Sequence, residues 1–184
     1  MFSLPNLITV LRLALVPVTG YFLLADEYGL ALIVFLIAAV TDLIDGFIAR
    51  RFELASELGA TLDPIADKLN MFVATVLLAW QGLLPLYLAI AIVLRDVVIV
   101  GGAFAYRFTL GHVEIAPTML SKVNTFLEFA VLLLVMTSAA RWIESDAWFP
   151  VAFAVVFTTV IASGIQYVWV WGWKAVRDSR ASIR

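Results

Sequence analysis

The stretch that decides both the fold and the chemistry runs from Asp42 to Asp67 and reads DLIDGFIARRFELASELGATLDPIAD. It contains four aspartates and two glycines inside a 184-residue chain that is 64% hydrophobic and only 14% charged. Long apolar runs on either side of this stretch are typical of an integral membrane protein. Ionisable residues are costly in such a protein, so those of this stretch are candidates for a functional site.

Apolar segments long enough to cross a bilayer as a helix, roughly 20 residues, occur six times along the chain. They are residues 5–24, 29–50, 57–80, 84–108, 117–139 and 149–173. The sequence therefore predicts an all-α, polytopic membrane protein with six transmembrane helices, built by residues 1–184 as a single domain. Lysines and arginines gather at one set of segment ends, which predicts that both termini are cytoplasmic. No cleavable signal peptide is expected, because Arg12 lies inside the first segment and a small-residue cleavage site is absent.

Composition excludes several kinds of site. The sequence has no cysteine and a single histidine, His112, which rules out disulfides, thiolate chemistry and a multi-histidine metal site within one chain. No internal repeat is visible, which argues against transporter folds built from paired halves.

The four aspartates form two pairs with helical spacing. Asp42 and Asp45 are three residues apart, and Asp63 and Asp67 are four apart, so each pair lies on one helix face. A short turn at about residues 51–56 would make the two helices antiparallel neighbours. All four carboxylates are therefore expected to converge at a similar depth.

Close carboxylates cannot all be ionised without a counter-charge. With no histidine or cysteine nearby, oxygen ligands select hard cations, Mg²⁺ or Mn²⁺ first, and two such ions would form a clamp for displacement at phosphorus. The alternative is that the aspartates form buried ion pairs. The nearby cations in the sequence are Arg50, Arg51 and Lys68, too few to balance the aspartates together with Glu53 and Glu57.

Other residues of the stretch suit a phosphate-bearing substrate. Gly46 and Gly59 remove side chains beside the carboxylates, so a bulky group can approach the backbone. Arg50 offers a bidentate contact to phosphate. Ser56 lies where the third helix is expected to begin, and its hydroxyl and the helix N–H groups there could hold a phosphate.

The N-terminal segment carries its own polar face. Asn6, Thr9 and Arg12 recur at three-residue intervals, so they share a broad face of the first helix. Taken alone, this pattern is explained by a capped juxtamembrane helix whose arginine extends to the membrane surface.

The spacing of the motif residues resembles the signature of a known family. Asp42-x2-Asp45-Gly46-x2-Ala49-Arg50-x8-Gly59-x3-Asp63-x3-Asp67 matches the CDP-alcohol phosphotransferases at every fixed position. The resemblance implies a Mg²⁺- or Mn²⁺-dependent membrane enzyme, usually a homodimer, that transfers a phosphatidyl or similar group from a CDP-linked donor to an alcohol and releases CMP. It also implies roles: Asp42, Asp45, Asp63 and Asp67 as metal ligands, Asp67 also as general base on the acceptor hydroxyl, and Gly46, Arg50, Ser56 and the Asn6–Thr9 segment as contacts to CDP.

The residues that would select the alcohol lie elsewhere. Arg95 lies mid-span in the fourth segment, and Arg107 and Lys122 flank the connection that follows. One interpretation pairs Arg95 with a motif aspartate or with Glu128 as a structural ion pair. The other makes these cations a binding site for the acceptor's phosphate. The sequence leaves both open.

A second resemblance concerns the acceptor. Arg95–Val97, Tyr106–Phe108 and Pro117–Thr125 look like segments of the CDP-diacylglycerol-dependent cardiolipin synthases, although the stretch from Arg107 to Pro117 is shorter than in mitochondrial members. The implied acceptor is phosphatidylglycerol, giving cardiolipin and CMP. Glycerol 3-phosphate, giving phosphatidylglycerophosphate, is the alternative. The sparse cations between Arg95 and Lys122 favour a monoanionic headgroup over a dianion.

The resemblance also implies a location and a set of partners. The expected location is the bacterial inner membrane, or the mitochondrial inner membrane in a eukaryote, with the active site facing the cytoplasm. The expected partners are the lipid substrates and a second copy of the chain, with no nucleic acid. A divalent-cation channel or carrier would also explain the aspartates. That alternative leaves Gly46, Gly59 and Arg50 unexplained.

Overall fold

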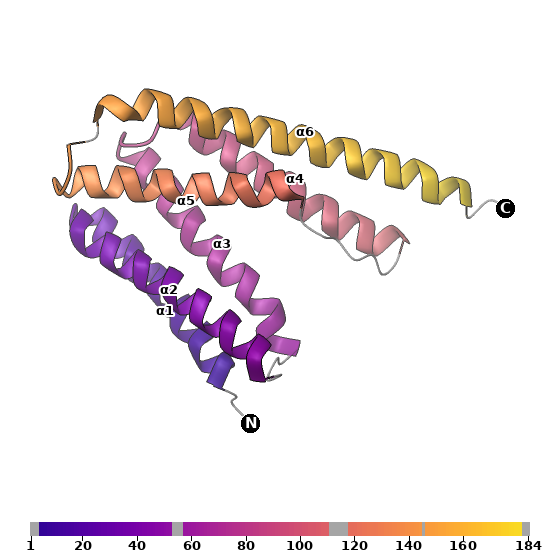
Figure 1. Ribbon diagram of the computed structural model, residues 1–184, viewed down its shortest axis with the longest axis horizontal. Coiled ribbons are helices and arrows are strands. Elements are labelled where there is room, and N and C mark those ends of the chain that lie inside the picture. The colour runs from indigo at the N-terminus through magenta and orange to yellow at the C-terminus, as the bar shows by residue number, and fades with distance from the viewer. Residues whose placement is uncertain (1–3, 53–56, 111–117, 145, 182–184) are drawn as a thin grey trace. The chain divides into compact units, whose positions relative to one another are not determined.

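The structure is a computed structural model that describes residues 4–52, 57–110, 118–144 and 146–181 (Figure 1). Within these ranges, side chains are described for residues 10–42, 68–102, 118–144 and 147–170. The described residues form α-helices and one short 3₁₀ helix, with no β-strand among them. The prediction of an all-α protein is confirmed.

Each of the predicted segments corresponds to one helix. The helices are α1 (Leu4–Leu24), α2 (Tyr28–Phe52), α3 (Glu57–Trp80), α4 (Leu86–Leu110), α5 (Met119–Ala139) and α6 (Phe149–Ala181), with the 3₁₀ helix η1 at Asp146–Trp148. Most predicted ends agree with the observed ends to within a few residues. The exception is α6, which continues past the predicted end at residue 173 because the basic segment that follows is also helical.

Among the described residues, two helical segments are both long and apolar enough to cross a membrane: Met119–Ala139, which is α5, and Phe149–Val170 within α6. Shorter apolar helical segments are Val10–Leu24, Tyr28–Asp42 and Lys68–Trp80. These segments are bounded by the residues whose side chains are described, so the remaining parts of α1, α2 and α3 are not assessed for apolar length. The number of spans and the side on which the termini lie stay predictions.

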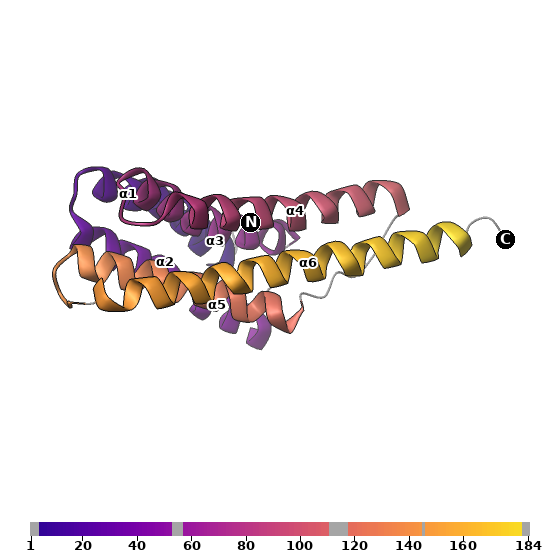
Figure 2. The same ribbon diagram turned by 90° about the horizontal axis from the view of Figure 1, so that it is seen from above.

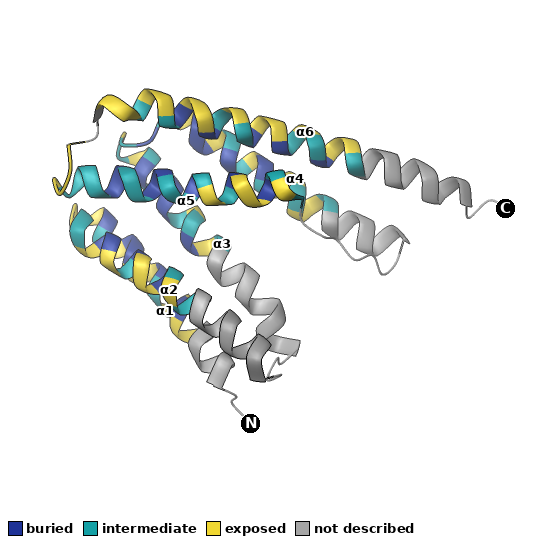
Figure 3. Ribbon diagram, viewed as in Figure 1, coloured by how far each residue is buried: buried dark blue, intermediate teal, exposed yellow. Residues whose placement is uncertain are grey.

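The chain divides into two compact units. Unit 1 consists of Met1–Leu84 with Leu132–Ala147, and unit 2 consists of Pro85–Val131 with Trp148–Arg184. Each unit has its own buried apolar side chains, and the helices show a buried stripe and an exposed one (Figure 3). Many exposed side chains are large and apolar, Leu86 and Trp169 among them. Such a surface is unfavourable in water and suits contact with lipid.

In unit 1, α1 packs against both α2 and α3 (Figure 1). Leu23 of α1 and Phe35 of α2 are fully buried. Gly20 lies where α1 meets α3: a Cβ at this position would be in ordinary van der Waals contact, 3.4 Å from Cγ1 of Val73 and 3.5 Å from Cδ1 of Leu77. This contact fixes the depth at which α1 and α3 meet.

In unit 2, α4 packs along α6 (Figure 2). The rings of Tyr87 on α4 and Phe157 on α6 meet edge to face with centroids 5.4 Å apart. The first turn of α5 is capped by Thr118, whose Oγ1 accepts a hydrogen bond from the backbone N–H of Ser121 at 3.2 Å. This cap fixes where α5 begins, next to the buried arginine of α4 described below.

Candidate functional site

The motif residues lie on two helices that contact each other. The backbones of Asp42, Asp45, Gly46 and Arg50 belong to the C-terminal half of α2, and those of Gly59, Asp63 and Asp67 to the N-terminal half of α3. The predicted helix assignment of the motif is therefore confirmed. Of the predicted metal ligands, only Asp42 has a described side chain. Ser56 lies outside the described residues altogether.

Asp42 forms an ion pair that the sequence did not predict. Its Oδ1 lies 2.6 Å from Nη1 of Arg12 on α1. The Arg12 side chain is only 1% exposed, whereas that of Asp42 is 37% exposed. The expectation that Arg12 extends to the membrane surface is thus wrong, because its charge is enclosed between helices. The predicted set of nearby cations was also incomplete, since it omitted Arg12.

For the residues of α1 predicted to contact the CDP-linked donor, the structure describes only the backbone. Asn6 and Thr9 lie in the first turns of α1, ahead of Arg12, and their side chains are outside the described ones. The two predicted residues therefore share with Arg12 the end of α1 that reaches the motif.

The residues of the motif fit a hard divalent cation. Among the described side chains no group of three or more His, Cys, Asp or Glu gathers, since three of the motif aspartates are not described. Asn70 adds an observation: its side chain is buried, and its Oδ1 has no hydrogen-bond partner in the described part of the chain. Asn70 follows Asp67 by three residues on α3, so it extends the face of Asp63 and Asp67. An amide oxygen with carboxylates is a ligand set that Mg²⁺ and Mn²⁺ accept.

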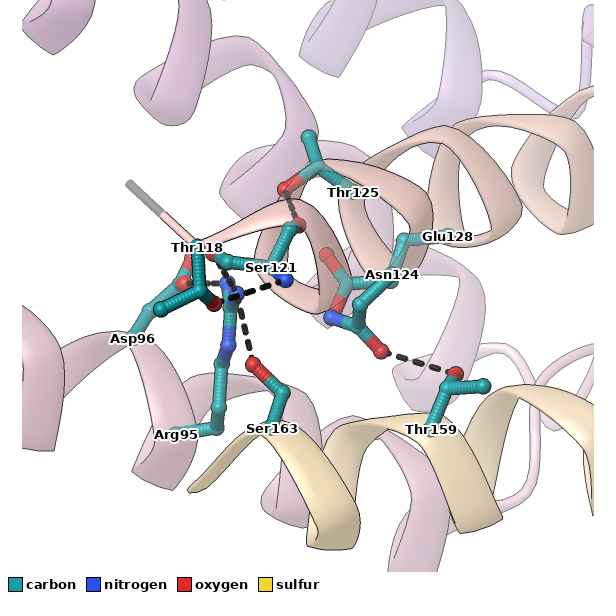
Figure 4. A network of polar contacts seen from close by, with 9 residues as sticks. All are labelled: Arg95, Asp96, Thr118, Ser121, Asn124, Thr125, Glu128, Thr159 and Ser163. Atoms are coloured by element: carbon teal, nitrogen blue, oxygen red, sulfur yellow. Dashed lines mark hydrogen bonds and ion pairs between the residues drawn. The ribbon is translucent and has the colours of Figure 1, made fainter. Parts of the chain in front are cut away.

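In unit 2, Arg95 forms the centre of a buried polar network (Figure 4). Its Nη1 donates to Oδ1 of Asp96 at 2.8 Å, and its Nη2 donates to Oγ of Ser121 at 2.5 Å and to Oγ of Ser163 at 3.2 Å. The side chain thus joins α4, α5 and α6. Its Nε is buried without a partner in the described part of the chain.

A second set of hydrogen bonds continues the network along α5 (Figure 4). Nδ2 of Asn124 donates to Oε1 of Glu128 at 2.6 Å, and Oγ1 of Thr159 on α6 donates to Oδ1 of Asn124 at 2.9 Å. Asn124 and Glu128 are both buried. The Asn124 amide therefore has a fixed orientation, with both its donor and its acceptor in use.

The network brings together part of the predicted acceptor site. Arg95 reaches the first turn of α5, where the free N–H groups of the helix make the surroundings electropositive. Lys122 lies on this turn, next to Ser121, and is exposed. Arg107 lies on α4, with its side chain outside the described ones. Arg95 forms an ion pair with Asp96. Neither interpretation of Arg95 drawn from the sequence named this partner.

Fold and motif together define a protein that is helical throughout its described part, with an exposed apolar surface and an aspartate motif on two contacting helices. The CDP-alcohol phosphatidyltransferase family model matches residues 2–171, and the chain belongs to that family. It is 37% identical over 181 residues to the cardiolipin synthase (CMP-forming) / mitochondrial hydrolase fusion protein of Schizosaccharomyces pombe, covering 90% of this chain and 30% of that protein.

Two further relatives bear different names. The cardiolipin synthase (CMP-forming) of Rattus norvegicus is 37% identical over 155 residues, covering 76% of this chain and 50% of that protein. The CDP-diacylglycerol–glycerol-3-phosphate 3-phosphatidyltransferase of Bacillus subtilis is 32% identical over 195 residues, covering 97% of this chain and 100% of that protein. The chain spans half or less of the length of the eukaryotic relatives that it matches.

Two side chains of interest were missed by sequence reasoning. Asn70 was detectable, because a polar residue three positions after Asp67 continues the motif face. The ion pair of Arg12 with Asp42 could not be predicted, because it depends on how α1 packs against α2. An arginine inside an apolar segment indicates only that a partner is needed, not which residue it is.

Proposed function

We propose that this chain transfers a phosphatidyl group from CDP-diacylglycerol to the hydroxyl of phosphatidylglycerol, giving cardiolipin and CMP. The observation that carries the proposal is the family's aspartate motif on two contacting helices, α2 and α3, of a chain that matches the family over residues 2–171. The Schizosaccharomyces and Rattus relatives carry the name cardiolipin synthase.

Glycerol 3-phosphate is the second candidate acceptor. It is favoured by the Bacillus subtilis relative, whose name specifies that acceptor and whose whole length is covered by this chain. The first candidate is preferred because the sequence between Arg95 and Lys122 contains few cations, which suits a monoanionic phosphodiester better than a dianion. Asp96, paired with Arg95 at 2.8 Å, further reduces the positive charge there.

The proposed reaction is a displacement at the lipid-side phosphorus of the donor. The acceptor oxygen forms a bond to that phosphorus, the bond from the phosphorus to the bridging oxygen of CMP breaks, and CMP leaves with the bonding electrons. Asp67 takes the proton of the acceptor hydroxyl. Mg²⁺ or Mn²⁺, two ions in the proposal, would supply charge neutralisation and orientation when bound by Asp42, Asp45, Asp63 and Asp67.

The remaining motif residues bind the donor in this proposal. Arg50 and Ser56 hold phosphate oxygens, and Gly46 and Gly59 leave room for the cytidine diphosphate against the backbone. Asn6 and Thr9 contact the same group from α1.

Arg95 holds the acceptor's phosphate, with Arg107 and Lys122 as further cations. The burial of Arg95 and its unpaired Nε support this role, because a buried donor without a partner is costly until a ligand satisfies it.

The chain's setting belongs to the same proposal. Residues 1–184 would form a single membrane domain of six spans, with both termini and the active site on the cytoplasmic side, in a homodimer. The supporting observations are the exposed apolar side chains and the two long apolar helical segments in α5 and α6.

The test of the chemistry is CMP release by the purified protein from CDP-diacylglycerol in mixed vesicles. We expect release that requires Mg²⁺ or Mn²⁺, stops on chelation and resumes when the ion is restored. Release that continues in a chelator would contradict the metal site. Metal binding with no CMP release under any condition would favour the channel or carrier instead, to be tested by ion flux into vesicles.

A further inference from the structure

The environment of Arg12 is not explained by the roles assigned above. Arg12, Arg95 and Glu128 are the buried charged side chains among the described residues. Of these, Arg12 alone belongs to unit 1, which carries the motif. Burying a guanidinium among apolar side chains is costly, and the ion pair with Asp42 offsets part of that cost for Arg12.

The two partners differ in exposure in an informative way. Arg12 is enclosed, at 1% exposure, whereas the carboxylate that it contacts is 37% exposed. The guanidinium therefore approaches Asp42 from the packed side of α1 and α2. The contact is to Oδ1, and the exposure of 37% leaves part of the Asp42 side chain accessible.

Helix register places Arg12 at about the depth of Asp67 on α3. Gly20 meets Val73 and Leu77 of α3, and α1 and α3 run in the same direction because α2 reverses the chain between them. Arg12 precedes Gly20 by eight residues, a rise of about 12 Å. The same step back along α3 reaches residues 65–69, a range that includes Asp67. Arg12 thus belongs at the level where the motif of α3 ends.

We propose that Arg12 is a positioning residue for the metal site: from α1, its guanidinium holds the Asp42 carboxylate in the orientation that binds a divalent cation. This inference rests on the proposed function, because it takes Asp42 to be a metal ligand. It adds to the motif a residue that the motif's spacing does not include. A carboxylate ligand needs such a partner, since loss of an outer partner typically costs 10–100-fold in metal affinity or activity.

Replacing Arg12 has two opposing effects on metal affinity, so the direction of the change tests the proposal. A guanidinium close to a metal ligand repels the cation, so its removal by charge alone would tighten metal binding. Its removal also frees the Asp42 side chain to adopt other rotamers, which weakens binding. The proposal requires the second effect to dominate.

The test measures Mn²⁺ affinity by electron paramagnetic resonance on the purified full-length protein without substrate. We expect Arg12→Leu to lower the affinity by roughly 10–100-fold. Arg12→Lys keeps a cation that can reach Asp42 without the planar fork, so its affinity should fall between those of Arg12→Leu and the wild type. Arg12→Gln, which retains donors without charge, gives a second reading should Arg12→Leu fail to fold. Affinity at or above the wild-type value in Arg12→Leu or Arg12→Gln would overturn the proposal.

Two control variants distinguish a specific effect of Arg12 on the metal site from a general effect of losing a buried arginine. Arg95→Leu removes the buried arginine of unit 2 and should leave Mn²⁺ affinity unchanged, which shows that loss of any buried arginine is not enough. Asp42→Asn should lower the affinity at least as far as Arg12→Leu. If Mn²⁺ binding depends on Arg12 but the wild-type protein releases no CMP, the role of Arg12 stands and the proposed function is refuted. Conversely, CMP release by the wild-type protein together with wild-type Mn²⁺ affinity in Arg12→Leu would support the proposed function and refute the role of Arg12.

Discussion

Unit 1 and unit 2 each contain a buried arginine, and the two arginines are held in different ways. Arg12 of unit 1 forms an ion pair with a carboxylate of the motif, that of Asp42, with Nη1 and Oδ1 2.6 Å apart. Arg95 of unit 2 meets two serine hydroxyls and its own chain neighbour, Asp96, and keeps an unpaired Nε. The first arrangement neutralises charge at a predicted metal site, whereas the second leaves positive charge partly available.

From this difference we infer that the two units have different roles in the proposed reaction. The motif helices of unit 1 would supply the metal ligands, the donor contacts and the base. The network of unit 2 would select the acceptor. Changes in unit 1 should then alter metal dependence and chemistry whatever alcohol is offered, and changes in unit 2 should alter the use of the alcohol alone.

The largest effect is expected from Asp67→Ala in unit 1. Loss of the general base should reduce CMP release by roughly 10²–10⁴-fold with either acceptor, measured with labelled CDP-diacylglycerol at saturating metal. Glu144→Gln, at an exposed position outside the motif, is the matched control and should release CMP at the wild-type rate. CMP release that persists in Asp67→Ala would remove the proposed base.

A smaller and more selective loss is expected from Arg95→Leu in unit 2. Hydrogen bonds to charged groups contribute about 1.5–3 kcal/mol, so kcat/KM for the acceptor should fall roughly 10–100-fold. The fall should appear as a raised acceptor KM, with Mn²⁺ affinity unchanged. Ser163→Ala removes only one longer contact and should have less effect. A lowered kcat with an unchanged acceptor KM would refute acceptor binding by Arg95.

Asn70→Leu tests whether the unpaired amide oxygen of α3 serves the metal site. Removing a buried amide oxygen that has no partner in the described part of the chain should not destabilise the protein, since such an oxygen costs about 1–3 kcal/mol. We therefore expect a melting temperature equal to or above that of the wild type, together with weaker Mn²⁺ binding. Thr75→Val, at a buried position further along α3, should leave Mn²⁺ binding unchanged. A lower melting temperature with unaltered Mn²⁺ affinity would make Asn70 a structural residue.

The smallest effect is expected from Thr159→Val, which removes the hydrogen bond to Asn124 in unit 2. A typical buried hydrogen bond contributes about 1 kcal/mol, so the melting temperature should fall by about 2–4 °C. CMP release should stay at the wild-type rate. A loss of activity much larger than the loss of stability would instead place the Asn124 amide in the acceptor site.

Local sequence patterns were sufficient for the helices and the motif. Apolar length and breaks at Gly82 and Pro85 predict where α3 ends and α4 begins, because these signals act within a few residues. The spacing of Asp42, Asp45, Asp63 and Asp67 likewise belongs to single helices, so helical periodicity alone gives their shared faces.

Contacts between helices were beyond sequence reasoning. The pairing of Arg12 with Asp42 depends on the close approach of α1 to α2, and a charge in an apolar helix has several ways to be satisfied. The partners of Arg95 come from α5 and α6, far along the chain, and serines give no charge pattern to detect. Position along a helix was thus predictable, while the choice among distant partners was not.

The most direct test of the central claim identifies the lipid that the purified protein forms. Vesicles with CDP-diacylglycerol and Mg²⁺ would be supplied with either phosphatidylglycerol or glycerol 3-phosphate, and the products analysed by mass spectrometry. The account predicts cardiolipin from phosphatidylglycerol, with one CMP released for each cardiolipin formed. A phosphatidylated product from glycerol 3-phosphate alone would contradict the assigned acceptor, and the absence of any phosphatidylated product with either acceptor would contradict the proposed chemistry.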